Sequence, residues 1–557
     1  MRSDDFLAGD QNALGRALLR TMGYANEELT KPKIGIANSW STVVPGSYNL
    51  KELAEKVKAG IYAAGGTPME FGTIGCCDGI GQANVGMKYI LPTRDVIASS
   101  IELMVEAQRL DAVVLMGSCD KIVPGMLMAA ARLRIPAIFI GGGPMLGGEV
   151  FHNRLSDINT PVEAQGMVAA GEASREEVND LEETCGPTCG SCAFLGTANS
   201  MNCIAEALGM SLTGMALVPA VFAERRRMAF ETGVKIVELT RRNITADQII
   251  TKEAIENAIK VCLAMGGSTN VVMHLTAIAG EAGIDMDVLG EFDRLSRTVP
   301  TIVRVNPMCY DRNMLDFFKD GGIPRVMSNM GDTLDRSVMT ANGVALGEAL
   351  DAYHYKYRSD RNVIHTMDDP FAKDGALAVM RGNLCPKTGV AKPGAIDDSV
   401  KHFVGKAICF DCEEDANRAI LDGTVQPGHV VVIRYEGPKG GPGMREMYTA
   451  MKVLNGRGLA TSTALITDGR FSGSNNGCFV GHISPEAQEG GPIAIVQDGD
   501  EIEIDIAERR VDLLVPQEEI DRRLAAWRAP APKVTRGYLA LYARMASSAA
   551  EGAVLKA

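Results

Sequence analysis

Short apolar runs alternate with longer amphipathic segments over the first third of the chain. The apolar runs predict strands at residues 33–37, 111–116 and 136–140. The amphipathic segments predict helices at residues 50–64 and 126–133, and a turn followed by a helix at residues 78–109. Strands that alternate with helices in this way are typical of a parallel sheet covered by helices. In such sheets ligands bind at the carboxyl ends of the strands, so we expect functional side chains in the turns there.

The pattern changes twice farther along the chain. Residues 197–295 show mainly helical periodicity, and beyond residue 374 short apolar runs are separated by Gly- and Pro-rich turns. These runs predict strands at residues 377–380, 429–434, 464–466, 493–496 and 501–506. Such spacing favours a mainly-β domain, closed as a barrel. We therefore predict the α/β class, with an N-terminal parallel-sheet α/β domain at residues 1–365 and a C-terminal mainly-β barrel domain at residues 366–557.

The charge and composition of the chain argue against some classes of partner and indicate its cellular compartment. The chain carries a formal net charge of -13, which argues against nucleic acid and against an anionic membrane surface as partners. No apolar run reaches the roughly 18 residues of a membrane-spanning helix, and the N-terminus lacks the basic and apolar regions of a signal peptide. We therefore expect a cytoplasmic protein. In that compartment its 13 cysteines do not form a disulfide framework, and they need another explanation.

The sharpest local signal follows the predicted strand at residues 111–116. Cys119, Asp120 and Lys121 stand side by side there, where a turn directs successive side chains into one crevice. A thiolate suits iron, a carboxylate suits a hard cation such as Mg²⁺, and a lysine can pair with an anion. The alternative is a strand-end turn with a buried cysteine and a surface ion pair. This tripeptide alone does not separate the two.

A second group of cysteines comprises Cys185, Cys189 and Cys192. No second pair at zinc-ribbon spacing accompanies them, and a thioredoxin-type redox pair would need a strand directly before it. An iron–sulfur cluster can draw its ligands from distant loops. We therefore expect Cys192 or Cys189 to bind such a cluster together with Cys119.

Two further loops offer ligands to a metal. Cys77 is a possible cluster thiol and Asp78 a candidate magnesium ligand, although the Asp-Gly pair that follows Cys77 also forms turns by itself. The loop at residues 436–446 is too rich in Gly and Pro for a strand or a helix. It lacks the ending of a phosphate-binding loop, and its Glu446 could supply an oxygen to a metal.

Hydroxyl groups mark two more loops. Ser472 lies between an aromatic residue and a glycine, which leaves its hydroxyl accessible, but no nucleophile elbow of a hydrolase surrounds it. Ser268, Thr269 and Asn270 precede a helical pattern. Their amides and hydroxyls could hold a substrate carboxylate, or they could simply cap the helix.

Taken together, these loops resemble the dihydroxy-acid and 6-phosphogluconate dehydratase family, over residues 35–486. The segments that carry the resemblance are residues 119–121 with 124–126, 187–192, 197–201, 266–270, 436–444 and 468–473. The resemblance implies an N-terminal α/β domain, a C-terminal β-barrel domain, an active site between them and a homodimer.

The resemblance also implies roles for individual residues. Cys119 and Cys192 match ligands of an iron–sulfur cluster, either 4Fe-4S or 2Fe-2S. The residues that match ligands of Mg²⁺ are Asp78, Asp120, Glu446 and Lys121, the last as a carbamate on its amine. Ser472 matches the residue that acts as base.

Departures from the family pattern bear on the cluster and on the substrate. Relatives with a two-iron cluster carry a third cysteine where this chain has Gly46, so Cys77 or Cys189 is a possible third ligand, and a four-iron cluster is expected. Residues 47–49 and 81–86 also depart from the pattern of branched-chain dehydratases.

The leading prediction for function is dehydration of 2,3-dihydroxy-3-methyl carboxylic acids to 2-keto acids in branched-chain amino-acid (valine, isoleucine) biosynthesis. The alternative within the family is a sugar-acid (aldonate) dehydratase with the same metals. A non-catalytic iron–sulfur redox sensor is the alternative from another class, and such a sensor has no need for the magnesium ligands or for Ser472.

Overall fold

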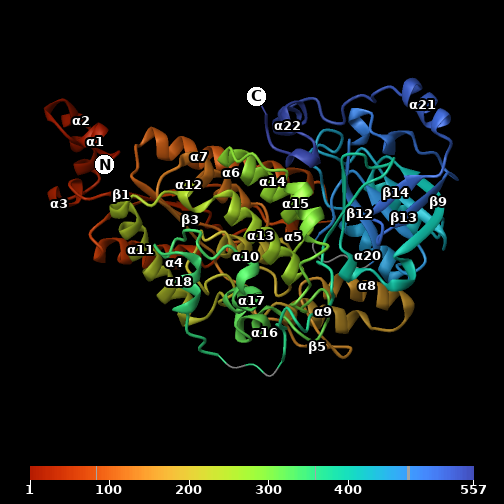
Figure 1. Cartoon of the computed structure of the whole chain (residues 1–557), viewed down its shortest axis with the longest axis horizontal. Coiled ribbons are helices and arrows are strands. Elements are labelled where there is room, and N and C mark those ends of the chain that lie inside the picture. Colours follow the sequence, from red (N-terminus) through yellow and green to blue (C-terminus); the bar gives the residue numbers. More distant parts are fainter. Residues whose placement is uncertain (83, 358, 360, 473–476, 557) are drawn as a thin grey trace.

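The computed structural model describes residues 1–557 except 83, 358, 360, 473–476 and 557. The N-terminal part, which is rich in helices, and the C-terminal part, which carries most of the strands, lie side by side (Figure 1). This arrangement confirms the predicted fold class.

A parallel sheet forms the core of the N-terminal part. Its described strands, in the order β2-β1-β3-β4, are β1 (Lys33–Asn38), β2 (Thr67–Gly72), β3 (Ala112–Met116) and β4 (Ala137–Ile140). Every residue of β1, β3 and β4 is buried, as expected for apolar strands covered on both faces. The three predicted strands are confirmed. The edge strand β2 has no predicted counterpart, because its burial is only partial and Pro68 interrupts its apolar residues.

Helices pack closely around this sheet. Those nearest to it are α4 (Leu50–Ala63), α6 (Met87–Ala107), α7 (Ile122–Leu133) and α11 (Ala223–Arg242). A Cβ on Gly60 of α4 or on Gly233 of α11 would lie 2.1 Å from a backbone oxygen of the other helix, so glycine permits this close packing. The two predicted helices are confirmed. α7 begins before the predicted residue 126 because Pro124 falls in its first turn, where proline needs no N–H partner.

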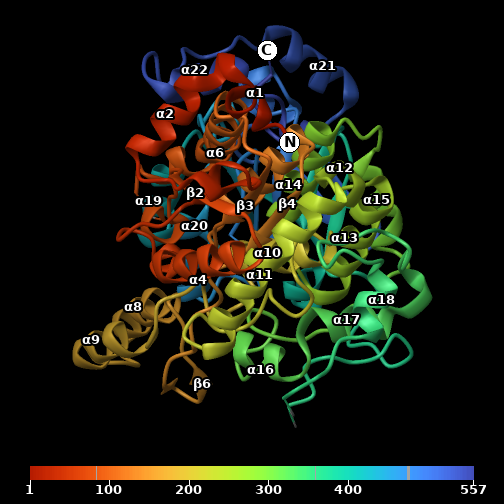
Figure 2. The same cartoon turned by 90° about the vertical axis from the view of Figure 1, so that its left-hand side faces the viewer.

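Residues 197–295 are mainly helical, as predicted. The helices there include α10 (Thr197–Ala207), α13 (Lys252–Met265), α14 (Asn270–Ala282) and α15 (Val288–Leu295). Shorter or more peripheral helices of the N-terminal part are α1 (Asp4–Leu7), α2 (Ala13–Thr21), α3 (Asn26–Leu29), α5 (Asp78–Gly81), α8 (Thr160–Ala170), α9 (Arg175–Thr184), α12 (Ala246–Ile249), α16 (Met314–Lys319), α17 (Gly322–Met330) and α18 (Leu346–Asp351). Figure 2 shows α8 and α9 projecting from the rest of this part.

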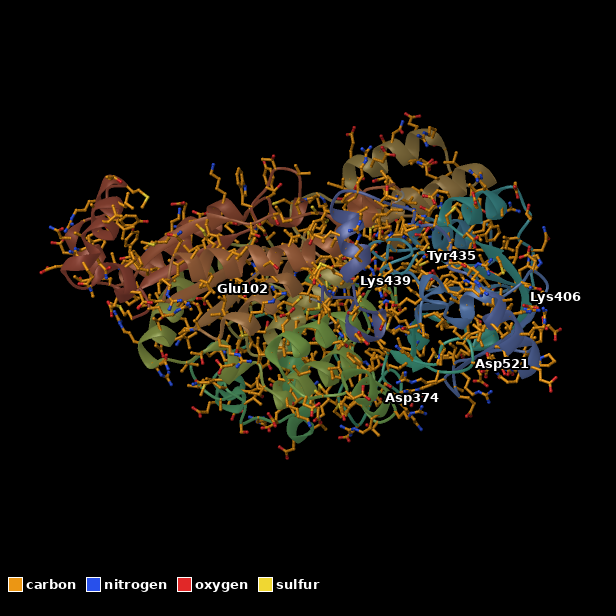
Figure 3. All side chains as sticks on the ribbon, turned by 90° about the horizontal axis from the view of Figure 1, so that it is seen from above. Glu102, Asp374, Lys406, Tyr435, Lys439 and Asp521 are labelled. Carbon is orange, nitrogen blue, oxygen red and sulfur yellow. The ribbon has the colours of Figure 1, made fainter. Side chains whose placement is uncertain are left out.

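The C-terminal part is built on a mixed sheet that curls into a nearly closed barrel. The order of its described strands is β14-β13-β9-β10-β11-β12-β8-β7. Their bounds are β7 (Ala378–Met380), β8 (Thr388–Ala391), β9 (His402–Phe410), β10 (His429–Ile433), β11 (Ala464–Thr467), β12 (Cys478–Ser484), β13 (Glu501–Asp505) and β14 (Arg510–Leu513). Backbone hydrogen bonds of Arg381 with Arg509 and Val511 join the first and last strands. The predicted barrel is confirmed, and Lys406 of β9 lies at the end of the molecule opposite the N-terminal helices (Figure 3).

One predicted strand of the barrel is wrong. Residues 493–496 fall mostly in a 3-10 helix, Pro492–Ile495, whose apolar side chains are nevertheless buried. A short apolar run is compatible with either structure, and Pro492 suits the first turn of a helix. Helices α19 (Glu413–Leu421), α20 (Tyr448–Gly456), α21 (Gln517–Ala526) and α22 (Tyr538–Met545) accompany the barrel.

The two parts hold each other through contacts far apart in sequence. α8 lies beside α20 (Figure 1), where Lys452 Nζ is 2.7 Å from Glu163 Oε1. The C-terminal segment returns to α6, where the buried Arg94 donates to the carbonyls of Gly552 and Ala553 at 2.8 and 2.9 Å. None of the described helices is both long enough and apolar enough to cross a membrane.

Candidate active site

A pocket of about 410 Å³ lies between the two parts of the molecule. The polar and thiol-bearing residues that line it include Cys77, Asp78, Gln82, Cys192, Thr197, Tyr448 and Ser472. The pocket therefore brings together predicted site residues from distant parts of the sequence, from Cys77 to Ser472. Ser472 comes from the loop after β11, and its side chain is half-buried.

The loop between β3 and α7 supplies Cys119, Asp120 and Lys121. All three are buried at the carboxyl end of the sheet, where parallel sheets carry their sites. Lys121 Nζ donates to Asp120 Oδ2 and lies 3.7 Å from Glu446 Oε1. Asp120 Oδ1 is buried and has no hydrogen-bond partner among the described residues. The ion pair of Lys121 and Asp120 is thus fully buried. It is not the surface ion pair that the sequence left as the alternative.

Burial disfavours the ionised form of two carboxyl groups of this cluster. Burial raises the pKa of Asp78 well above its ordinary value, and the nearby Asp120, Cys77 and Glu446 raise it further. Burial likewise raises the pKa of Asp120, although Lys121 opposes the shift. Carboxylates packed together away from water ionise readily only when a positive charge joins them.

Glu446 reaches this cluster from the C-terminal part and is held on both oxygens. Gln82 Nε2 donates to its Oε2 at 2.9 Å, while Asn270 Nδ2 and Arg470 Nη1 donate to its Oε1 at 2.9 and 2.8 Å. Burial alone would raise the pKa of Glu446. Arg470, Lys121 and the hydrogen bonds from Gln82 and Asn270 outweigh it, so the pKa is lowered and the side chain is kept anionic.

The predicted substrate loop at residues 268–270 lies directly behind the pocket. Ser268 Oγ is 2.8 Å from Thr197 Oγ1, and Asn270 Nδ2 also donates to Thr197 Oγ1 at 3.0 Å. Thr269 Oγ1 is buried without a partner among the described residues. Ser268 and Asn270 thus support Thr197 and Glu446, and their role in binding substrate stays a prediction.

Three thiols lie close to Asp78. The side chains of Cys77 and Cys119 are hydrogen-bonded, which lowers the pKa of Cys77 to about 7 and raises that of Cys119. Cys192 lines the same pocket as Cys77, and burial raises the pKa of its thiol well above the ordinary value. Cys189 lines a different pocket, beside Trp40 and Tyr48. Of the two possible third ligands, Cys77 is the one that is hydrogen-bonded to Cys119 and shares a pocket with Cys192.

Gly46 lies against the same thiols. A Cβ at this position would come within 2.6 Å of Cys119 Sγ and within 3.4 Å of the Ser118 Cβ. Any side chain here would therefore occupy space beside the Cys119 thiol. A cysteine at this position would be directed toward the same thiols.

These donor sets fit the two cofactors that the family resemblance implies. Oxygen donors around Asp120 suit Mg²⁺, and grouped thiols suit an iron–sulfur cluster. The unpartnered Asp120 Oδ1 leaves an acceptor for a cation. Among the described residues, no three His, Cys, Asp or Glu side chains already meet the geometry of a metal-ion site. The Lys121 ammonium instead lies against Asp120 and near Glu446, where a cation would be bound.

Two residues of the site, Arg470 and Gln82, were not among the predicted ones. Arg470 is fully buried and its Nη1 also donates to Asn270 Oδ1 at 2.8 Å. Its position two residues before Ser472 was the available signal. Gln82 belongs to the stretch that departs from the family pattern, and no feature of the sequence alone indicates that it touches Glu446.

Comparisons with known proteins identify the family of this chain. The sequence model described as dihydroxy-acid/6-phosphogluconate dehydratase N-terminal matches residues 31–349, and its C-terminal counterpart matches residues 362–553. The chain is 49% identical over 559 residues to the dihydroxy-acid dehydratase of Caldanaerobacter subterraneus subsp. tengcongensis, which covers 100% of this chain and 99% of that protein. It is 48% identical to the dihydroxy-acid dehydratases of Ruminiclostridium cellulolyticum and Pyrococcus furiosus, with 100% of each chain covered. The chain therefore belongs to the dihydroxy-acid/6-phosphogluconate dehydratase family of hydro-lyases, as its motifs predict.

Proposed function

We propose that this chain dehydrates 2,3-dihydroxy-3-methyl carboxylic acids to 2-keto acids, as a step of valine and isoleucine biosynthesis. The observation that carries the proposal is the single pocket lined by Ser472, Asp78 and the thiols of Cys77 and Cys192. Apolar side chains also line it, namely Ile80, Ile158, Val162 and Phe194, and they suit a methyl-branched substrate. Relatives that match over the full length carry the corresponding name.

Two cofactors belong to this proposal. Asp78, Asp120, Glu446 and Lys121 as a carbamate would hold Mg²⁺, and Cys77, Cys119 and Cys192 would hold an iron–sulfur cluster of the 4Fe-4S type. When bound, these groups supply Lewis acidity toward the oxygens of the substrate. Burial lowers the pKa of Lys121, which favours the neutral amine that can react with carbon dioxide.

Residues of the chain itself carry out the remaining steps of the reaction. Ser472, as its alkoxide, takes the proton from C2 of the substrate while the C3 hydroxyl leaves as hydroxide, and the resulting enol tautomerises to the 2-keto acid. A serine hydroxyl does not lose its proton readily in water, so positive charge close by is needed to stabilise the alkoxide. The carboxylates that line the metal site keep that charge beside the pocket.

The alternatives differ in what they require of the pocket. An aldonate dehydratase needs an acceptor for an extra hydroxyl, and Gln82 offers one. A redox sensor has no use for a buried group of carboxylates behind its thiols. We also propose a cytoplasmic homodimer with a small-molecule substrate.

The test is formation of 2-keto acid by the anaerobically purified protein with Mg²⁺, comparing 2,3-dihydroxyisovalerate with a panel of aldonates. We expect turnover of the branched-chain acid. Ser472→Ala should abolish turnover and leave the visible absorption of the cluster unchanged, whereas Ser462→Ala, outside the pocket, should retain activity. Turnover that survives in Ser472→Ala would remove this residue as the base. An intact cluster without activity on any acid would favour the sensor.

A further inference from the structure

Gln82 connects the two parts of the molecule at the edge of the pocket. It follows α5 directly and lines the pocket together with Asp78 and Ser472. Its Nε2 donates to Glu446 Oε2 at 2.9 Å, although the two residues lie 364 positions apart. Its Oε1 is buried and has no hydrogen-bond partner in the part of the chain that the structure describes.

The orientation of this amide is fixed by its neighbour. The two ends of a glutamine amide look alike in shape, so hydrogen bonding has to decide which one is the oxygen. A flipped amide would place its oxygen against the Glu446 carboxylate, which can only accept hydrogen bonds. The nitrogen must therefore face Glu446, and the carbonyl must face away from it. A buried carbonyl without a partner calls for a donor, and a substrate in the pocket can supply one.

We propose that Gln82 is a specificity-determining residue that accepts a hydrogen bond from a substrate hydroxyl. This inference rests on the proposed dehydratase function. The hydroxyls at C2 and C3 are the groups on which the reaction acts. The hydroxyl that donates a hydrogen bond to Gln82 is therefore a further one, at C4. The apolar lining accepts a methyl branch, and Gln82 extends the substrate range to 2,3-dihydroxy acids that carry a C4 hydroxyl.

A pair of variants separates this role from the support that Gln82 gives to Glu446. Gln82→Met keeps the length of the side chain but removes the carbonyl and the donor to Glu446. Asn270→Ala is the matched control, because Asn270 also donates to Glu446 but does not line the pocket. Loss of support for Glu446 alone should affect all substrates alike, whereas loss of the carbonyl should affect only substrates with a C4 hydroxyl.

The experiment measures kcat and KM of each protein on 2,3-dihydroxyisovalerate and on a four-carbon or five-carbon aldonate. We expect the unmodified chain to use both, and Gln82→Met to lower the ratio of kcat/KM, aldonate over branched-chain acid, by about tenfold, mainly through KM. Asn270→Ala should leave the ratio unchanged. Gln82→Leu serves in its place if Gln82→Met does not fold, as judged by thermal unfolding.

The outcomes separate the role of Gln82 in specificity from the dehydratase function on which it rests. If Gln82→Met leaves the ratio unchanged, or if the unmodified chain turns over only the branched-chain acid, the role of Gln82 in specificity is overturned while the dehydratase function stands. If the unmodified chain with its cluster intact produces 2-keto acid from neither class, the proposed function fails and this inference fails with it.

Discussion

Asn270 and Arg470 face each other across the boundary between the two parts of the molecule, with Arg470 Nη1 2.8 Å from Asn270 Oδ1. Both side chains also donate to Oε1 of Glu446. Oε1 of the carboxylate that the C-terminal part contributes to the site is therefore held by one group from each part. Glu446 is therefore placed correctly only when the two parts are docked correctly.

Removal of Arg470 should destabilise the metal-free protein strongly. Arg470→Met leaves the buried Glu446 carboxylate without its nearest guanidinium, and loss of one partner of a buried ion pair costs about 3 kcal/mol or more. Urea unfolding of the metal-free protein measures the change. Arg418→Met is the control, since Arg418 pairs with Asp415 on the surface and should cost less than about 1 kcal/mol. Equal effects of the two variants would contradict the prediction.

The thiols near Asp78 should differ in their importance for the cluster. Cys77→Ser removes a side chain that is hydrogen-bonded to Cys119, and we expect it to reduce iron content and visible absorption severalfold. Cys189→Ser alters a thiol in another pocket and should leave both unchanged. Anaerobic reconstitution followed by iron and sulfide analysis provides the measurement. Loss of iron only in Cys189→Ser would reverse the assignment of the third ligand.

Gly46 should be needed for its lack of a side chain. Gly46→Ala introduces a Cβ that would lie 2.6 Å from Cys119 Sγ, so the thiol must move and cluster content should fall by about half or more. Gly72→Ala is the matched control, because a Cβ there meets no atom within 4 Å. Iron analysis and thermal unfolding of both variants test this expectation. A fully loaded Gly46→Ala protein would show that the thiol tolerates the shift.

Glu206 of α10 should make stability depend on pH. It is buried, and it accepts hydrogen bonds from the N–H groups of Gly214 and Ala216. Burial raises the pKa of Glu206 to about 7, above its ordinary 4.5. The folded state then binds this proton more tightly than the unfolded state does. Its contribution to the free energy of unfolding is therefore largest in acid, falls as the pH rises through this interval, and stays level above it.

Glu206→Gln isolates this effect from the other titrating groups. The difference in free energy of unfolding between the unmodified chain and the variant should fall by about 3 kcal/mol between pH of about 4.5 and about 7. Urea unfolding at a series of pH values measures it. Parallel pH profiles of the two proteins would show that Glu206 does not titrate in this interval.

The pattern of apolar residues predicted strands that are apolar along their whole length. It failed where a short apolar run is compatible with both a strand and a helical turn. β3 is buried along its whole length, and its apolar run was sufficient to predict it. Residues 493–496 are equally apolar but form a 3-10 helix, because burial does not distinguish a short strand from a helical turn. β9 was missed because exposed residues interrupt its burial pattern.

The residues of the candidate site also divide into those that the sequence indicated and those that it did not. Cys119, Asp120 and Lys121 are consecutive and follow a strand, so chemistry and position together indicated them. Gln82 and Arg470 act through contacts that only the folded chain creates. Gln82 meets Glu446 from 364 positions away, and no spacing rule spans that distance.

The hydrogen bonds from Arg94 to Gly552 and Ala553 tie the packing of α6 to a segment that lies 458 and 459 positions later in the chain. During synthesis, the cysteines and the first carboxylates of the site therefore emerge long before the segment that packs against α6. The N-terminal part can reach its final packing only once that segment has been made. A cofactor inserted earlier would meet an unfinished enclosure.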